Sequence, residues 1–345
     1  MWRRHWHMIS IYSVAHCLVD FACAFLMFRS IAQARDWYYY ILVYNFCAFA
    51  MQMPIGIVAD KLDRNHLIAG AGCILVGAAY GLTGIPLVSV ITAGLGNGMF
   101  HIGGGIDVLN ISEEKSGALG VFVSPGAFGV YFGTLAGKGG GPAAIPVVIA
   151  LLAAAGFIIV SRRVWSKTYV PNVPFSPAPS KQKIPGVLIT VACLFLVVCL
   201  RSFVGLALNF PWKAAGYWGL ALVCASVFGK TAGGFLSDKL GPLKTAVLTL
   251  GVSALLFLFP HTAAAGTGAV LFFNMTMPVT LWVTAKIFPG AKGFSFGLLT
   301  FALFLGFLPV YLGLSASVWL FAPAAAVSLA LLYAGLSRLE KRDGV

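Results

Sequence analysis

Apolar runs long enough to cross a membrane follow one another through most of this chain, and they leave few folds open to it. A helical span needs about 20 apolar residues. The mean hydropathy is +0.91, and only 10% of the 345 residues are charged, whereas a soluble domain carries about 25%. The runs are continuous rather than alternating, which argues against a transmembrane barrel. We therefore expect an all-α membrane protein.

Twelve transmembrane helices can be placed, with short loops between them. The predicted spans lie at 8–28, 37–58, 67–84, 86–107, 117–137, 142–160, 185–206, 213–236, 244–260, 267–287, 293–312 and 316–336. A polar stretch at 161–184 contains several prolines, which prevent a continuous helix. We predict an N-terminal six-helix bundle over 1–160, a cytoplasmic linker over 161–184 and a C-terminal six-helix bundle over 185–345, with the two bundles pseudo-symmetric.

The net charge of +13 is distributed unevenly over the loops. In the twelve-span arrangement one side receives most of the Lys and Arg residues, and the other side receives only Arg29, Arg35, Lys138 and Lys213. The positive-inside rule then puts both termini in the cytoplasm of a multi-pass protein of the cell (inner or cytoplasmic) membrane. The basic excess is explained by topology and by contact with anionic lipid, so we expect no nucleic-acid partner.

A charged segment occurs once in each half of the chain. Gly56-Ile-Val-Ala-Asp60-Lys61-Leu-Asp-Arg64 recurs as Gly234-Phe-Leu-Ser-Asp238-Lys239-Leu, with the two aspartates about half the chain length apart. Such a repeat is typical of a membrane protein built from two related bundles. An aspartate there can accept hydrogen bonds from the N-terminus of a neighbouring helix, or pair with a nearby Arg or Lys.

We interpret these hairpins as a conformational latch that closes in one state and opens in another. A plain topology anchor is the alternative. The latch residues are Gly56, Asp60, Lys61, Arg64, Asp238 and Lys239.

Most acidic residues, Asp60 and Asp107 among them, can be placed at membrane edges or in loops, and Asp20 is the exception. It lies well inside the first span, and His16 lies one turn earlier on the same face. An ionisable group in lipid costs at least about 2.5–3.5 kcal/mol, so this face should point into the protein or a watery cavity. We assign Asp20 and His16 to proton coupling or substrate contact. A structural hydrogen bond between helices is the alternative.

Other polar side chains inside the spans are candidates for substrate binding. They are Arg201, His101, Asn274, Gln52 and Lys230. Arg201 comes to a depth similar to that of Asp20, and we hypothesise that the two pair across a cavity. Lys230 could instead snorkel to the interface, and Asn274 could form a hydrogen bond between helices. Because the deep groups are mainly basic, a negatively charged substrate is favoured.

Motifs for catalysis are missing from the sequence. There is no phosphate-binding Gly-rich loop, no Gly-x-Ser-x-Gly elbow and no His-Glu-x-x-His helix. The seven cysteines fall inside spans and fit best as apolar fillers. His16 and Cys17 face in different directions on a helix. We therefore expect no enzyme activity, no cofactor and no metal site.

The paired hairpins resemble the signature cytoplasmic loop of the major facilitator superfamily. Four further segments resemble efflux carriers of the fosmidomycin-resistance type. They are His16-Cys-Leu-Val-Asp20, Gln52-Met-Pro54-Ile-Gly56, Gly94-Leu-Gly96-Asn-Gly-Met-Phe100-His101 and Phe122-Val-Ser-Pro-Gly126-Ala-Phe-Gly129.

This resemblance implies the major facilitator fold, with a substrate site between the first, fourth, seventh and tenth spans. It implies a proton-coupled secondary transporter that works by alternating access and exports a small organic anion or drug by antiport. Proton-symport uptake of a small nutrient and a sensor that binds without transporting are the alternatives. Because one chain holds both halves of the path, we expect a monomer whose partners are the substrate, protons and the lipid bilayer.

Overall fold

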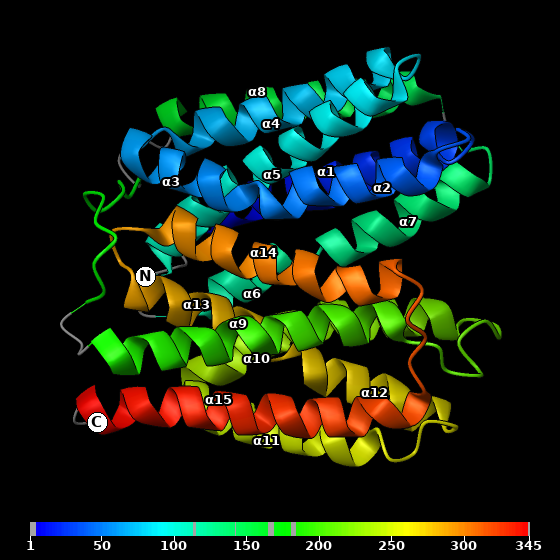
Figure 1. Cartoon of the computed structure of the whole chain (residues 1–345). Coiled ribbons are helices and arrows are strands. Elements are labelled where there is room, and N and C mark those ends of the chain that lie inside the picture. The colour runs from blue at the N-terminus through cyan, green and yellow to red at the C-terminus, as the bar shows by residue number, and fades with distance from the viewer. Residues whose placement is uncertain (1–4, 113–114, 142, 165–168, 181–183, 344–345) are drawn as a thin grey trace. The chain divides into compact units, whose positions relative to one another are not determined.

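The computed structural model describes residues 5–112, 115–141, 143–164, 169–180 and 184–343, and this part of the chain contains helices and no strand (Figure 1). The helices are α1 (Trp6–Leu26), α2 (Trp37–Asn45), α3 (Gln52–Leu62), α4 (Asn65–Ala79), α5 (Pro86–Ile111), α6 (Gly117–Val123), α7 (Gly126–Lys138), α8 (Ala144–Val164), α9 (Ile184–Ala207), α10 (Trp218–Leu240), α11 (Pro242–Leu256), α12 (Ala263–Asn274), α13 (Met277–Ile287), α14 (Lys292–Tyr311) and α15 (Phe321–Asp343). The predicted all-helical class is confirmed for the described residues. Residues 165–168 and 181–183 of the predicted linker lie outside them.

Several predicted spans consist of two helices in line. A wider turn at Phe46–Ala50 joins α2 to α3, and Ser124 and Pro125 separate α6 from α7. Pro125 has no backbone N–H to donate, and its ring would clash with the carbonyl of the residue four positions earlier, which accounts for the interruption between α6 and α7. Pro278 similarly stands at the start of α13, just after the break from α12.

Ten helical stretches in the described part are long and apolar enough to cross a membrane. Helices also cover the other two predicted spans. Pro242–Leu256 is apolar but short, and Pro86–Ile111 is long but contains many glycines together with Asn97 and His101. The second predicted span continues as a helix to Leu62. Asp60 and Lys61 therefore lie in the last turns of α3, and the turn itself is formed by Asp63 and Arg64.

The chain forms two compact units. The first comprises Met1–Ile111, Pro125–Ser176 and Gly290–Phe301, and the second comprises Ser112–Ser124, Pro177–Pro289 and Ala302–Val345. Each unit thus takes one helical segment from the opposite half of the sequence. The start of α14 belongs to the first unit, and α6 belongs to the second, where it packs on α10 and α13.

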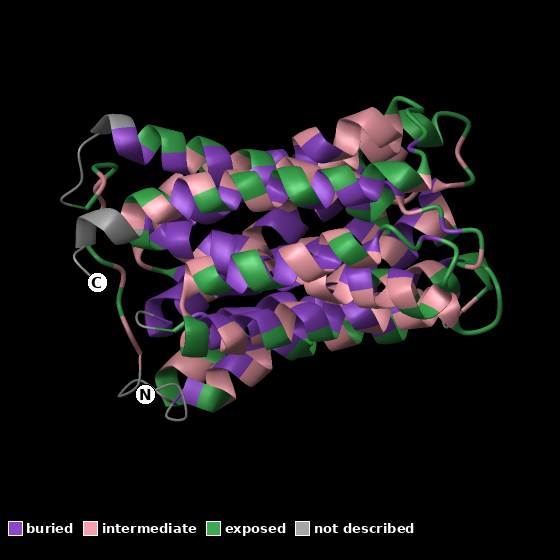
Figure 2. Cartoon of the chain, turned by 90° about the horizontal axis from the view of Figure 1, so that it is seen from below, coloured by how far each residue is buried: buried purple, intermediate pink, exposed green. Residues whose placement is uncertain are grey.

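In the first unit α4 packs on α5 and α8, and α1 packs on α7. Glycines make the second contact close, because a Cβ atom at Gly129 or Gly133 would overlap backbone atoms of α1. Small residues of this kind let helix backbones approach in a membrane protein. In the second unit Phe210 stacks on Trp212 at 4.7 Å between ring centroids, and Phe257 is fully buried nearby. Figure 2 shows how buried and exposed residues occupy different sides of the helices.

Candidate functional site

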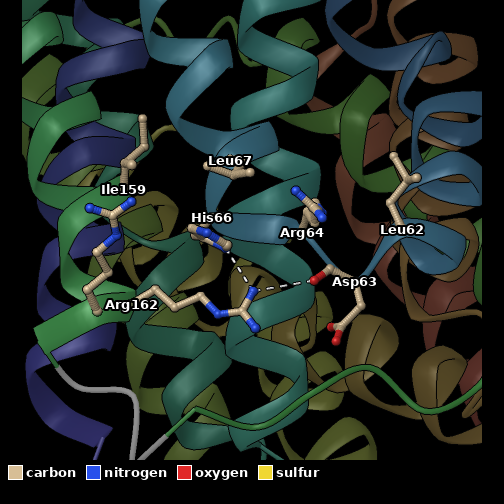
Figure 3. A pocket seen from close by; sticks show the side chains of 8 residues that line it. Leu62, Asp63, Arg64, His66, Leu67, Ile159 and Arg162 are labelled. Atoms are coloured by element: carbon tan, nitrogen blue, oxygen red, sulfur yellow. Dashed lines mark hydrogen bonds between the residues drawn. The ribbon is translucent and has the colours of Figure 1, made fainter.

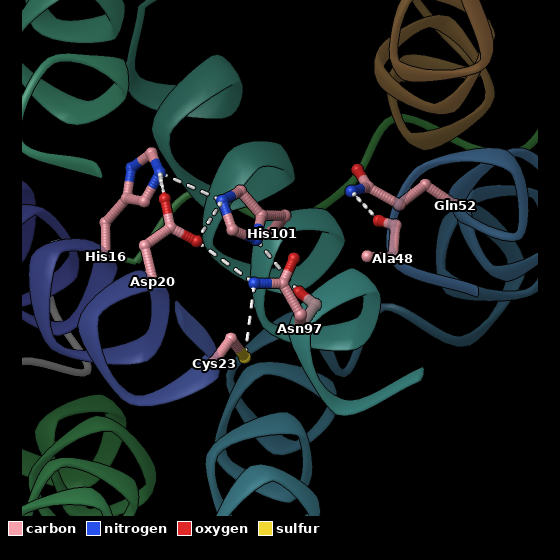
Figure 4. A network of polar contacts seen from close by, with 7 residues as sticks. All are labelled: His16, Asp20, Cys23, Ala48, Gln52, Asn97 and His101. Carbon is pink, nitrogen blue, oxygen red and sulfur yellow. Dashed lines mark hydrogen bonds and ion pairs between the residues drawn. The ribbon is translucent and has the colours of Figure 1, made fainter. Parts of the chain in front are cut away.

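Asp20 lies beside two imidazole rings in the first unit (Figure 4). The Nε2 atom of His16 lies 3.2 Å from Asp20 Oδ2, and the Nε2 atom of His101 lies 3.8 Å from Asp20 Oδ1. The two Nε2 atoms are 2.9 Å apart. His16 and Asp20 come from one face of α1, as the sequence spacing predicts, and His101 comes from α5. We call these three residues the His–Asp–His triad.

Asn97 holds two members of the triad at once. Its side-chain Nδ2 donates to Asp20 Oδ1 at 3.0 Å, and its backbone carbonyl lies 2.9 Å from Nδ1 of His101. The sequence analysis did not single out Asn97. Its position one helical turn before His101, with both on the same face of α5, is the signal that could have found it.

These contacts fix where protons can sit. A carbonyl oxygen only accepts, so Nδ1 of His101 must carry a hydrogen, and in the neutral ring its Nε2 is an acceptor. His16 must then donate from its own Nε2 to His101, with the Asp20 carboxylate beside the same N–H group. In the neutral rings these contacts therefore assign one hydrogen to Nδ1 of His101 and one to Nε2 of His16.

Gly126 closes the triad from a third helix. A Cβ atom at this first residue of α7 would overlap His16 Nε2 and Asp20 Oδ2. Only glycine leaves room for both side chains, so the Ser124-Pro125-Gly126 break serves the site as well as the fold.

The triad atoms also form a possible set of metal ligands, since they all lie within 4.8 Å of one another. In the described part of the chain this is the group of His, Cys, Asp or Glu side chains that could share an ion. From the sequence we expected no metal site, because His16 and Cys17 face in different directions and no second cluster of ligands accompanies Asp20. The third member, His101, is far away in the sequence and could not be placed without the fold.

Asp20 is not the only acid inside the protein. Asp107 is 2% exposed, and its carboxylate accepts hydrogen bonds from Tyr12 at 2.6 Å and Asn65 at 2.8 Å. Asp60 is 5% exposed. From the sequence we expected both at membrane edges or in loops. In the structure neighbouring helices cover both carboxylates and supply hydrogen-bond donors.

Arg201 lies buried in the second unit. Its two terminal nitrogens donate to Thr280 at 3.3 Å and Thr276 at 2.8 Å, and its Nε has no hydrogen-bond partner in the described residues. The two threonines hold the guanidinium but do not neutralise it. Asp20 belongs to the other unit, so the hypothesised Asp20–Arg201 pair stays a prediction.

The other residues predicted to bind substrate are Asn274, Gln52 and Lys230, and each has a different environment. Asn274 donates to the carbonyl of Val270 in its own helix and accepts from Ser226 of α10, which is a contact between helices. Gln52 donates to Ala48 at 2.6 Å, and its buried Oε1 has no partner in the described residues. Lys230 is half-buried in α10.

The Asp60 carboxylate binds the N-terminus of a helix. It accepts hydrogen bonds from the backbone N–H groups of Gly293 at 2.7 Å and Phe294 at 2.9 Å, at the start of α14. These residues all belong to the first unit. Gly56, one turn before Asp60, is required by the close approach, because a Cβ atom there would overlap Gly293.

Asp238 makes the equivalent contact in the second unit. Its carboxylate accepts from the backbone N–H groups of Ser116 at 2.6 Å and Gly117 at 3.1 Å, at the start of α6. Gly234 stands one turn earlier, as Gly56 does in the first copy, and packs on Ser116. The repeated motif thus builds the same carboxylate-to-helix contact twice.

Asn172, within the predicted linker, was missed by the sequence analysis. Its Oδ1 accepts from Asn65 and Asn110, both at 2.8 Å, and its backbone N–H donates to Asp63 at 2.9 Å. Tyr169 also donates to Asp63, and burial together with this hydrogen bond raises the pKa of the Tyr169 hydroxyl. Tyr169 and Asn172 of the linker are therefore docked on the first unit.

Comparison with known proteins gives a short sequence match and extensive structural ones. No protein-family model matches the chain. An uncharacterized MFS-type transporter of Bacillus subtilis, YfiU, is 35% identical over 117 residues, which is 32% of this chain and 19% of that protein. The chain therefore matches about a fifth of the length of this curated relative.

The structural matches cover nearly the whole chain. The fucose:proton symporter FucP of E. coli, a major facilitator superfamily transporter, is 13% identical with a TM-score of 0.66, over 96% of this chain and 98% of that one. The human organic anion transporter MFSD10 is 14% identical with a TM-score of 0.68, over 96% and 99%. The chain therefore has the fold of the major facilitator superfamily of membrane transporters.

Proposed function

We propose that this chain is a proton-coupled secondary transporter of the major facilitator type, related to the fosmidomycin-resistance carriers. It would work by alternating access between two six-helix bundles and export a small organic anion or drug by antiport. The twelve-span arrangement, cytoplasmic termini, location in the cell membrane and monomeric state belong to the same proposal. The fold and the short match to an MFS-type transporter support it.

One observation carries the coupling: the buried His–Asp–His triad in α1 and α5. A carboxylate beside two imidazoles can take up a proton and stabilise the cation formed. The 2.9 Å contact between His16 and His101 admits one hydrogen. A further proton would push the rings apart and turn His101 toward Asp20 Oδ1. Because the rings stand on different helices, proton uptake would change how α1 packs on α5.

The substrate charge is proposed from Arg201. Its guanidinium is buried, is held by two threonines and has no carboxylate within salt-bridge distance in the described residues. An anionic group of the substrate would satisfy Nε and offset the buried charge. The structural neighbours include an organic anion transporter, which is compatible with this substrate class. They also include a fucose:proton symporter, so uptake by symport stays the alternative.

The two aspartate contacts would act as latches during the cycle. Asp60 and Asp238 each bind two backbone N–H groups at a helix start. Such contacts are favoured by the positive end of the helix dipole. If they form in one conformation and break in the other, they set the relative populations of the two states.

Transport by proteoliposomes with the Asp20→Asn variant tests the proposal. The variant should lose accumulation driven by a pH gradient while keeping exchange of substrate between the two sides. Full pH-driven accumulation in Asp20→Asn would contradict the assigned proton site. Binding without exchange in the wild-type protein would favour the sensor, and accumulation in the direction of proton flow would favour symport.

A further inference from the structure

A cavity of about 540 Å³ opens in the first unit between the end of α3, the start of α4 and the end of α8 (Figure 3). Its lining includes three arginines, Arg64, Arg162 and Arg163, and one acid, Asp63. In the described part of the chain none of these arginines forms an ion pair with a carboxylate. Among the described residues the cavity lining thus carries three guanidinium groups and a single carboxylate, which is an excess of positive charge.

The single acid at the cavity is already engaged. Its Oδ1 accepts from the Tyr169 hydroxyl at 2.7 Å and from the Asn172 backbone at 2.9 Å. Arg162 instead contacts the backbone carbonyl of Asp63, at 3.5 Å, and Nδ1 of His66, at 3.4 Å (Figure 3). Its guanidinium also lies over the Tyr169 ring at 3.9 Å from the centroid. Arg162 is thus fixed in place, and Arg64 and Arg163 are exposed beside it.

The other part of the cavity wall is apolar. It is formed by Leu62, Leu67 and Ile159. The helices concerned are the ends of the candidate membrane spans Trp37–Leu62, Asn65–Leu82 and Ala144–Val164. Because these are candidate spans by length and composition, we expect the cavity at the level where they leave the hydrocarbon, with the arginines on its polar side. A ligand that matches both walls has an anionic head and an apolar tail.

We propose that this cavity binds the phosphate group of an anionic phospholipid. Guanidinium groups are planar donors that fit phosphate oxygens in pairs, and basic pockets between helix ends are suited to lipid head groups. The acyl chains would lie along Leu62, Leu67 and Ile159. The head group would connect the start of α4 to the end of α8. This site is separate from the His–Asp–His triad and does not depend on transport.

Native mass spectrometry of the full chain, delipidated in a non-ionic detergent, tests the site. The probes are phosphatidylglycerol, phosphatidylcholine and inorganic phosphate. The test variant is Arg64→Gln/Arg163→Gln, which leaves the packed Arg162 in place. The matched control is Lys244→Gln/Arg338→Gln, which removes two exposed cations from the second unit.

Phosphatidylglycerol should bind the wild-type chain and the control at least about tenfold more tightly than phosphatidylcholine. The Arg64→Gln/Arg163→Gln variant should lose this preference. Equal retention of phosphatidylglycerol by this variant and the control would overturn the site. Equal binding of the two lipids by the wild-type chain would overturn the need for net negative charge. Displacement of phosphatidylglycerol by an equal concentration of inorganic phosphate would identify a free-phosphate site instead.

Discussion

His16 and His101, 85 positions apart in the sequence, place their Nε2 atoms 2.9 Å from each other beside the Asp20 carboxylate. Asn97 fixes the hydrogen of His101 on Nδ1, so only one hydrogen can occupy the space between the rings. Under the proposed coupling, an added proton would separate the two rings and change how α1 packs on α5.

Replacing His101 by Gln should strongly weaken the response to pH. A Gln side chain can form hydrogen bonds beside Asp20 and His16, but it cannot take up a proton. We expect pH-driven accumulation to fall at least about tenfold, the equivalent of about 1.4 kcal/mol, with little change in substrate exchange. Transport by proteoliposomes at several pH gradients measures both rates. His261→Gln, at an exposed position, is the control, and a pH response in His101→Gln equal to that of this control would exclude the proton-switch role.

Gly126→Ala should damage the triad although it neither adds nor removes a polar group. The added methyl would overlap His16 and Asp20, so α7 must move away from α1 or the triad must rearrange. Overpacking of this kind costs about 1–3 kcal/mol, and thermal unfolding followed by tryptophan fluorescence should detect it together with loss of transport. Gly156→Ala is the matched control, because nothing lies within 4 Å of the added atom. It should be neutral or slightly stabilising, and the same behaviour in Gly126→Ala would show that the close approach is absent.

Asp60→Asn and Asp238→Asn should each weaken one helix-terminus contact. The amide of Asn keeps one acceptor oxygen, but its NH₂ group would face the second backbone N–H. Each variant therefore loses a hydrogen bond to a charged group, and such bonds contribute about 1.5–3 kcal/mol to stability. We expect a lower unfolding temperature in both variants and slower transport, because the latched state loses stability. Asp36→Asn, at an exposed position before α2, should change neither measurement. Wild-type transport in both latch variants would leave the hairpins as topology anchors only.

Much of the fold could be predicted because membrane-spanning helices are encoded locally. Apolar length and the charged repeat predict twelve spans, and a helix of the described residues lies in each of them. The assignment of segments to units could not be predicted in the same way. The start of α14 joins the first unit and α6 joins the second, and these placements depend on contacts between residues more than a hundred positions apart.

The candidate site was predictable only where its members share one helix. His16 and Asp20 are four residues apart, and the rule for helix faces brings them together. His101 and Asn97 required the packing of α5 on α1, which no local pattern supplies. The docking of Asn172 was missed for a related reason: an asparagine in a proline-rich stretch looks like any other loop residue until Asn65 and Asn110 are placed around it.

Arg201→Lys should fail to replace arginine at the proposed substrate site. The two terminal nitrogens of the guanidinium donate to Thr280 and Thr276, and Nε is left to donate to a substrate. The single ammonium group of lysine cannot reproduce this planar set of three donors. We expect the thermal shifts produced by a panel of small carboxylates and phosphonates to disappear in Arg201→Gln and to stay absent in Arg201→Lys. Lys213→Gln, which removes an exposed cation from the same unit, should keep the wild-type shifts. If the thermal shifts are present in Arg201→Lys, a positive charge alone is sufficient for binding. The proposed contact between the anion and Nε of Arg201 would then be excluded.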